Sequence, residues 1–222
     1  CLLSRGLGDV YKRQTYNRNF KNKKSFQSLF LFYVTLTFGG VFLTKSISMN
    51  LFRAYQQVFE SALEDFNQDQ SPQNLYLPMQ YLLDLGGKRI RPFLTLMAGG
   101  AYGVSVKEAL GAAMAVEVFH NFTLMHDDIM DKATLRRGKT TVHEKWDVNT
   151  AILSGDAMLI KAYQCLETYQ IDVFQQLTRL LSKTAIEVCE GQQYDMDFET
   201  RPNTSEEEYI EMIQLKTAVL VG

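Results

Sequence analysis

Three aspartates near the middle of the chain have the types and spacing for the most specific chemistry in the sequence. Asp127, Asp128 and Asp131 form the segment DDIMD among apolar residues. Asp127 and Asp131 are four residues apart, so on a helix their carboxylates lie on one face, one turn apart. Carboxylates in apolar surroundings repel each other and are costly to desolvate. A hard divalent cation relieves this, and oxygen ligands with an incomplete shell favour Mg²⁺ bridging to a phosphate. The alternative is that one aspartate caps the helix and the others face water.

Two cationic clusters stand on either side of the aspartates. The segment GGKRIRP places Lys88 and Arg91 at a glycine turn that enters a helix, where backbone N–H groups favour anions. Downstream, Arg136 and Arg137 can bind phosphate oxygens in bidentate fashion. Either cluster alone could be a solvated basic turn. Together with the acidic segment they predict a site for two phosphorylated substrates.

The elements that must position these residues are all expected to be helices. From Met49 onward apolar residues recur at helical spacing, no alternating strand pattern is evident, and the whole chain has four prolines. The fold class is therefore predicted to be all-α. Helices are expected over residues 51–66, 79–85, 92 to about 97, 106–132, 150–169, 173–189 and 205–221.

Charge and cysteine content exclude some classes of function. Residues 1–48 hold eight Lys or Arg against one Asp or Glu, whereas the remainder has fifteen against twenty-four. An acidic body argues against nucleic acid as a partner. Cys1, Cys165 and Cys189 lack metal-ligand spacing, which fits a reduced cytoplasmic location and buried thiols.

The first 48 residues differ from the rest and are expected to be a leader, or upstream sequence not native to the protein, outside the domain at 49–222. Basic residues precede an apolar run over 29–43, as in a signal peptide or signal anchor. The run is shorter than the about 20 residues that span a membrane, so no stable anchor is expected. The other interpretation is that the protein starts at Met49.

Four segments in order resemble the trans-polyprenyl diphosphate synthase family over about 49–222: GGKRIRP, EVFHNFTLMHDDIMDKATLRRG, GQQYD and LKT. The resemblance implies a homodimer of antiparallel helical bundles, each around a central cavity. It implies Mg²⁺-dependent condensation of isopentenyl diphosphate with an allylic diphosphate, giving a product of about C15–C20. Diphosphate leaves the allylic substrate, the alkene attacks the resulting cation, and a proton is lost to the released diphosphate.

The resemblance also assigns roles to motif residues. Asp127 and Asp131 would hold Mg²⁺, with Asp128 acting behind them. The residues expected to bind isopentenyl diphosphate are Lys88, Arg91, His120 and Arg137. Those expected at the allylic diphosphate are Arg136, Lys216 and Thr217, so that Asp127, Asp131, Arg136 and Lys216 form the catalytic set. Phe122, with Thr123 beside it, would floor the product pocket and limit chain length.

One motif of the family is absent from the sequence. A second aspartate-rich segment should follow the Lys-Thr pair, but none occurs before Gly222. We therefore expect a C-terminally truncated domain that binds substrate but condenses it poorly. Three other interpretations remain: a class I terpene cyclase, a noncatalytic subunit of a prenyl synthase, and an HD-type phosphohydrolase using His126 and Asp127. His143 is expected to be structural.

Overall fold

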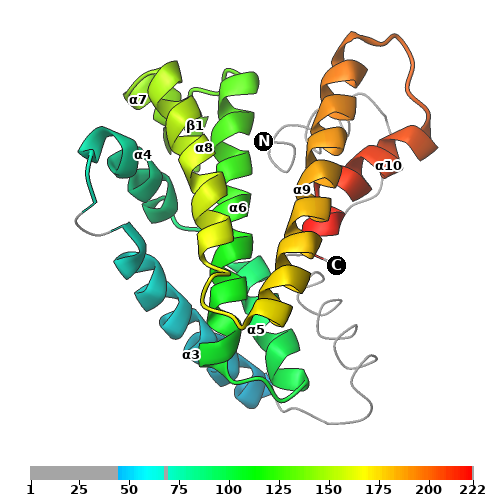
Figure 1. Ribbon diagram of the computed structural model, residues 1–222. Helices are drawn as coiled ribbons and strands as arrows, with labels where there is room; N and C mark the ends of the chain where they lie inside the picture. Colours follow the sequence, from blue (N-terminus) through cyan, green and yellow to red (C-terminus); the bar gives the residue numbers. More distant parts are fainter. Residues whose placement is uncertain (1–44, 68–69, 222) are drawn as a thin grey trace. The chain divides into compact units, whose positions relative to one another are not determined.

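A computed structural model describes residues 45–67 and 70–221, and this part of the chain is almost entirely helical (Figure 1). The all-α prediction is therefore confirmed. The described residues divide between two units after Ala54, and the candidate site lies within the second, from Tyr55 onward. The elements are α3 (Lys45–Glu64), η1 (Asp65–Asn67), α4 (Gln73–Asp84), α5 (Ile90–Ala101), α6 (Val106–Met130), β1 (Leu135–Arg136), β2 (Lys139–Thr140), α7 (Val142–Lys145), α8 (Val148–Gln164), α9 (Ile171–Thr200), α10 (Glu206–Lys216) and η2 (Ala218–Leu220).

Helix α6 is the central element of the second unit and carries the aspartates at its C-terminal end. Its start is fixed by a capping box: the Ser105 hydroxyl accepts the Glu108 N–H at 3.3 Å, and the Glu108 carboxylate accepts the Ser105 N–H at 3.0 Å. Helix α6 packs along α8 and against α5 (Figure 1). Because it is covered on several sides, apolar residues occur almost all round it.

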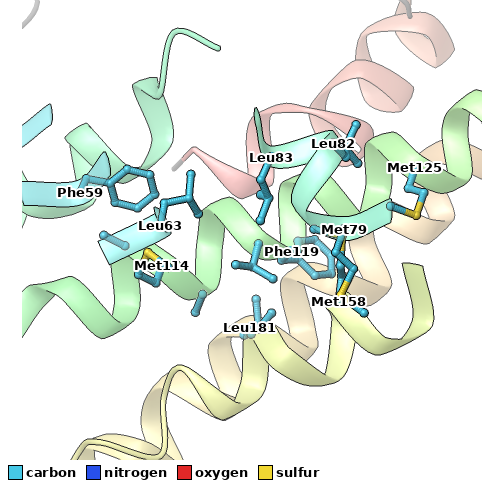
Figure 2. Packing of buried hydrophobic residues seen from close by; sticks show 14 of the residues in the cluster. Phe59, Leu63, Met79, Leu82, Leu83, Met114, Phe119, Met125, Met158 and Leu181 are labelled. Atoms are coloured by element: carbon cyan, nitrogen blue, oxygen red, sulfur yellow. The ribbon is translucent and has the colours of Figure 1, made fainter. Parts of the chain in front are cut away.

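The hydrophobic core lies where α4 and α8 cover α6. Phe119 of α6, Met79 of α4 and Met158 of α8 point toward one another and are at most 1% exposed (Figure 2). Fully burying side chains of this size stabilises the fold by roughly 1.5–3 kcal/mol each. This packing fixes the axis of α6, and so fixes where its C-terminal carboxylates lie.

Several helix boundaries agree with the sequence prediction. The predicted 106–132 helix is α6, and Pro92 lies in the first turn of α5. Helix α4 ends at Asp84, and Gly86 follows with φ +72°, as expected for a glycine at a helix end. Helix α3 begins at Lys45, so the last four residues of the predicted 1–48 leader are helical. The rest of that prediction, residues 1–44, lies outside the described residues.

Other boundaries were predicted wrongly. The 173–189 helix extends as α9 to Thr200, because tertiary contact at Gly191 overrides the low helix propensity of glycine. The last predicted helix, 205–221, ends as α10 at Lys216 and is followed by the short turn η2. The β1–β2 hairpin was missed, because two-residue strands are too short to show a period.

The cysteines follow the prediction only in part. Cys165 is partly buried, and burial raises the pKa of its thiol to about 11. Cys189 is exposed, which contradicts its predicted burial; it lies on the outer face of α9. Cys1 lies outside the described residues. Within the described part of the chain, no helix is both long enough and apolar enough to cross a membrane.

Candidate functional site

The aspartates of DDIMD lie at the C-terminal end of α6 as their spacing predicts. Asp127 and Asp128 are buried, at 7% and 3% exposure. Asp131 caps the helix, and its N–H donates to the Asp127 carbonyl at 2.9 Å. Burial, and then the neighbouring Asp127 carboxylate, raises the pKa of Asp131. The ionised form of Asp131 is therefore less favoured here than in water, and a cation bound beside it would favour that form.

Arg136 is bound to these aspartates rather than free in solvent. Its Nε and Nη2 donate to the two carboxylate oxygens of Asp128 at 2.7 and 2.8 Å, and Nη2 lies 3.7 Å from Asp127 Oδ2. Burial raises the pKa of Asp128, and the bidentate bond to Arg136 opposes that rise. Asp128 thus holds a guanidinium beside Asp127, and its expected place behind metal ligands stays a prediction.

Lys216 of α10 pairs with Asp127 and with Asp195 of α9. Its Nζ lies 2.8 Å from Asp195 Oδ2 and 3.4 Å from Asp127 Oδ1. Thr217 is the C-cap of α10, and its N–H donates to the Ile213 carbonyl at 2.9 Å. The structure therefore brings Lys216 to the aspartate cluster although 89 residues of sequence separate it from Asp127.

The segment GQQYD explains how α10 comes so close to α9. A Cβ at Gly191 would overlap the backbone nitrogen of Lys216 and lie 2.7 Å from its Cα. Asp195 lies one turn after Gly191 on the same face of α9, where it pairs with Lys216. The family resemblance through GQQYD assigned no role to Asp195. The four-residue spacing from glycine to aspartate was the available signal.

The upstream cationic cluster forms about two turns before the aspartates along α6. Arg91 Nη1 lies 3.3 Å from His120 Nε2, and the buried Arg91 Nε has no hydrogen-bond partner among the described residues. Burial, then the charge of Arg91 and of the neighbouring arginines, lowers the pKa of His120 to about 3. Arginine only donates, so Nε2 of the neutral ring accepts and its proton is on Nδ1. His120 therefore offers an uncharged N–H donor beside Arg91.

Arg137 joins this cluster across the glycine loop. A Cβ at Gly87 would lie 3.1 and 3.2 Å from the two terminal nitrogens of Arg137, so the guanidinium rests on the loop. Lys88 is exposed next to it. Desolvation, followed by repulsion from Arg89 and Arg136, lowers the pKa of Arg137. The two cationic segments that the sequence separates by more than 40 residues thus form one surface.

The β1–β2 hairpin directs its two arginines to different partners. Leu135 pairs with Thr140 and Arg136 with Lys139, and the two turn residues, Arg137 and Gly138, have φ of +54° and +77°. Positive φ at both positions is typical of a type I′ turn. One arginine thereby reaches the aspartates of α6, and the next reaches the glycine loop.

The predicted chain-length residues lie on α6 between His120 and Asp127. Phe122 is partly buried, with its ring 5.5 Å from that of Phe119 and 4.8 Å, edge-on, from that of His126. Five residues of helix place Phe122 about 140° around α6 from Asp127. The Thr123 hydroxyl donates to the His120 carbonyl at 2.7 Å. Whether these two residues limit product length stays a prediction.

The histidines argue against an HD-type phosphohydrolase. His126 packs against Gly155 of α8, and its Nε2 lies 3.2 Å from the Ile152 carbonyl oxygen. His143 is buried, with a side-chain exposure of 6%, which agrees with a structural role. Within residues 45–67 and 70–221, no group of three or more His, Cys, Asp or Glu side chains is arranged to hold a metal by itself.

Known proteins with similar sequences are prenyl diphosphate synthases. A geranylgeranyl diphosphate synthase of Methanosarcina mazei is 45% identical over 163 residues, which are 72% of this chain and 50% of that protein. A farnesyl diphosphate synthase of Bacillus subtilis is 37% identical over 161 residues, 68% of this chain and 54% of that protein. The chain spans about half the length of the curated relatives it matches.

Solved structures lead to the same group of proteins. A crystal structure of a geranylgeranyl pyrophosphate synthase is 59% identical and superposes with a TM-score of 0.75 over 77% of this chain and 52% of that one. The synthetase of Pyrococcus horikoshii gives a TM-score of 0.73 at 35% identity, over 78% and 54% of the two chains. The family model "Polyprenyl synthetase" matches residues 72–222. The chain, with its acidic and cationic clusters placed along α6, therefore belongs to the polyprenyl synthetase family.

Proposed function

We propose that this chain forms the substrate-binding part of a trans-prenyltransferase that condenses isopentenyl diphosphate with an allylic diphosphate. The observation that carries the proposal is the division of α6 into two charged sites. Asp127, with Asp131 and Lys216, forms an acidic site at its end, and Arg91 with His120 forms a cationic site two turns earlier. Only a reaction of two diphosphates uses both.

The acidic site fits Mg²⁺ as a partial coordination shell. Asp127 and Asp131 offer two carboxylates one turn apart, and burial, followed by the charge of Asp127, raises the pKa of Asp131. Mg²⁺ is usually bound through one or two carboxylates together with waters and substrate phosphates. A site of two aspartates is therefore the expected donor set for Mg²⁺ carried in with a diphosphate. Bound there, the ion would supply Lewis-acid stabilisation of the leaving diphosphate.

The residues of the chain hold and orient the two substrates. Arg136 and Lys216 set positive charge beside Asp127, where the diphosphate of the allylic substrate would leave with the electrons of the broken C–O bond. Thr217 would add a contact at the end of α10. Arg91, Arg137 and Lys88 would hold the diphosphate of isopentenyl diphosphate, with His120 as a neutral donor. The alkene carbon then bonds to the allylic carbon, and the proton lost passes to the released diphosphate.

Two finer features belong to this proposal. We place the products at about C15–C20, with Phe122 and Thr123 limiting their length; relatives of the chain include geranylgeranyl and farnesyl diphosphate synthases. In that case Phe122→Ala should shift products to longer chains in thin-layer analysis. The cytoplasmic location and the homodimer stay predictions.

The two rival functions within this fold make different demands on the cationic site. A terpene cyclase binds one diphosphate, so Arg91 and His120 would have no ligand. A noncatalytic subunit needs neither site, yet both are assembled here around α6. A requirement for isopentenyl diphosphate separates the synthase from the cyclase.

Calorimetric binding tests the proposal directly on the 222-residue chain. Asp127→Ala should abolish Mg²⁺-dependent binding of farnesyl diphosphate and leave metal-independent binding of isopentenyl diphosphate within about threefold, which is roughly 0.7 kcal/mol. Arg91→Gln should do the reverse, and chelating Mg²⁺ should mimic Asp127→Ala. Asp172→Asn, an exposed change at the start of α9, is the matched control. If Asp127→Ala retained full Mg²⁺-dependent affinity, the proposed function would be wrong.

A further inference from the structure

A buried ion pair lies beneath the glycine loop and belongs to neither substrate site. Arg89 is 8% exposed and Glu117 of α6 is 4% exposed. Arg89 Nη1 donates to Glu117 Oε1 at 2.5 Å, and Nη2 donates to the Leu83 carbonyl at 2.7 Å. Arg89 therefore ties the end of α4, the start of α5 and the middle of α6 together from one side chain.

The backbone of Arg89 requires this anchoring. Arg89 is the N-cap of α5 and has φ +47°, ψ +37°, in the left-handed region. That conformation is unfavourable for a residue with a Cβ and persists only where the surroundings hold it. It also sets the turn between Lys88 and Arg91, and so the direction from which each approaches an anion. The hydrogen bonds of the guanidinium to Glu117 and to the Leu83 carbonyl stabilise this backbone conformation.

Glu117 is itself held rigidly. Asn121 Nδ2 donates to the Glu117 carbonyl at 2.8 Å and lies 3.3 Å from Oε1. Asn121 is 1% exposed, so this contact is shielded from water. A carboxylate with two donors in a buried setting is fixed in position, and can fix Arg89 in turn.

Glu117 also supplies the negative charge that the cationic cluster needs in the absence of a ligand. Burial lowers the pKa of Arg91, and the charge of Glu117 acts in the opposite direction. The same carboxylate opposes the lowering of the Arg137 pKa by desolvation and by neighbouring arginines. Three guanidinium groups and a neutral His120 can thus stay close together before an anion arrives.

We infer that Arg89 and Glu117 are positioning residues: without touching substrate, they hold the glycine loop, Arg91 and Arg137 in an arrangement that binds a diphosphate. The identity of that ligand as isopentenyl diphosphate rests on the proposed function. The positioning itself is independent of it, because any diphosphate would need the same arrangement of donors.

Binding of inorganic pyrophosphate in metal-free buffer tests the inference by calorimetry. Arg89→Lys keeps every charge but loses the two-pronged bond, so it should weaken pyrophosphate binding about tenfold or more. Glu117→Gln keeps the shape of the side chain but removes the charge that pairs with Arg89, and it should weaken pyrophosphate binding to a similar degree. Arg201→Lys and Glu187→Gln make the same exchanges in surface ion pairs and should leave binding unchanged. Thermal melts of each variant report folding.

The two variants separate positioning from simple charge. If charge alone mattered, Arg89→Lys would bind like the wild type and Glu117→Gln would bind pyrophosphate more tightly; either result overturns the inference. If neither variant melted cooperatively, the pair would be a stability element and not a positioning device. A wild type that binds no pyrophosphate overturns both the inference and the proposed function. A wild type that binds pyrophosphate but not isopentenyl diphosphate overturns the function alone.

Discussion

Replacing Gly191 by alanine tests whether the close approach of α9 and α10 builds the acidic site. The new Cβ would overlap the Lys216 backbone nitrogen and lie 2.7 Å from Lys216 Cα and 2.8 Å from Leu215 C. All three are backbone atoms, so no side-chain rotation relieves the overlap. Helix α10 has to move away from α9.

The size of the effect follows from these distances. Reaching an ordinary carbon contact of about 3.5 Å requires Lys216 Cα to retreat by roughly 0.8 Å. With the Lys216 side chain in its present conformation, such a shift would lengthen the 3.4 Å contact between Lys216 Nζ and Asp127 Oδ1 beyond the range of an ion pair. Overpacking costs about 1–3 kcal/mol, and the better helix propensity of alanine returns about 1 kcal/mol. A net loss of up to about 2 kcal/mol should lower the Tm by up to about 8 °C.

Two measurements follow this prediction. Calorimetric melts report the Tm, and Mg²⁺-dependent binding of farnesyl diphosphate reports the position of Lys216. The affinity for farnesyl diphosphate should fall about tenfold or more, because a hydrogen bond to a charged group contributes about 1.5–3 kcal/mol. Gly100→Ala in α5 is the control. Its Cβ would meet only one atom, the Tyr55 hydroxyl at 3.0 Å, so a shift of a few tenths of an ångström relieves the contact and the loss of stability should be smaller than for Gly191→Ala. A Gly191→Ala variant that melts above the wild type with unchanged affinity would refute the reasoning.

Two further predictions concern ionisable groups on α6. The pKa of His120 is about 3 in the folded chain but near 6.5 when unfolded, so stability should fall as pH drops below about 6.5, by up to about 1.4 kcal/mol per pH unit. His120→Gln should flatten that part of the urea-melt profile, whereas a wild-type imidazole seen by NMR to titrate near 6.5 would contradict it. The pKa of Asp131 is raised by burial and by Asp127, so its ionisation destabilises the fold as pH rises above the unfolded value near 3.8. Asp131→Asn should therefore raise the Tm at pH 7 while weakening Mg²⁺-dependent binding, and an unchanged or lower Tm would argue against the predicted repulsion.

The parts of the site that lie on one helix could be predicted from the sequence. The spacing of His120, Asp127 and Asp131 places them on one stripe of α6 as soon as the helix is recognised, and an apolar segment of that length without proline makes the helix evident. Local chemistry likewise marked Gly86 as the end of α4, because few other residues tolerate its positive φ.

The contacts between elements could not be predicted in the same way. Arg89 and Glu117 are 28 residues apart, and the sequence gives no sign that one is the counter-charge of the other. Gly191 lowers the helix propensity of α9, and only its contact with Lys216 shows that it is a packing surface and not a helix end. A sequence pattern shows the periodicity of residues along one helix. The Arg89–Glu117 ion pair and the Gly191–Lys216 contact each join two different segments, so no such pattern predicts them.

The tight turn of β1–β2 limits how this region of the protein can vary in length. Exposed loops usually accept insertions and deletions with little cost. Here Arg136 and Arg137 are consecutive residues with separate destinations, the Asp128 carboxylate and the Gly87 backbone. Adding or removing one residue in the hairpin would exchange the sides to which the two guanidinium groups are directed. Substitutions in its exposed strand positions should therefore be tolerated far better than any single-residue indel, and a length-variant library of this hairpin should yield almost exclusively variants of the original length.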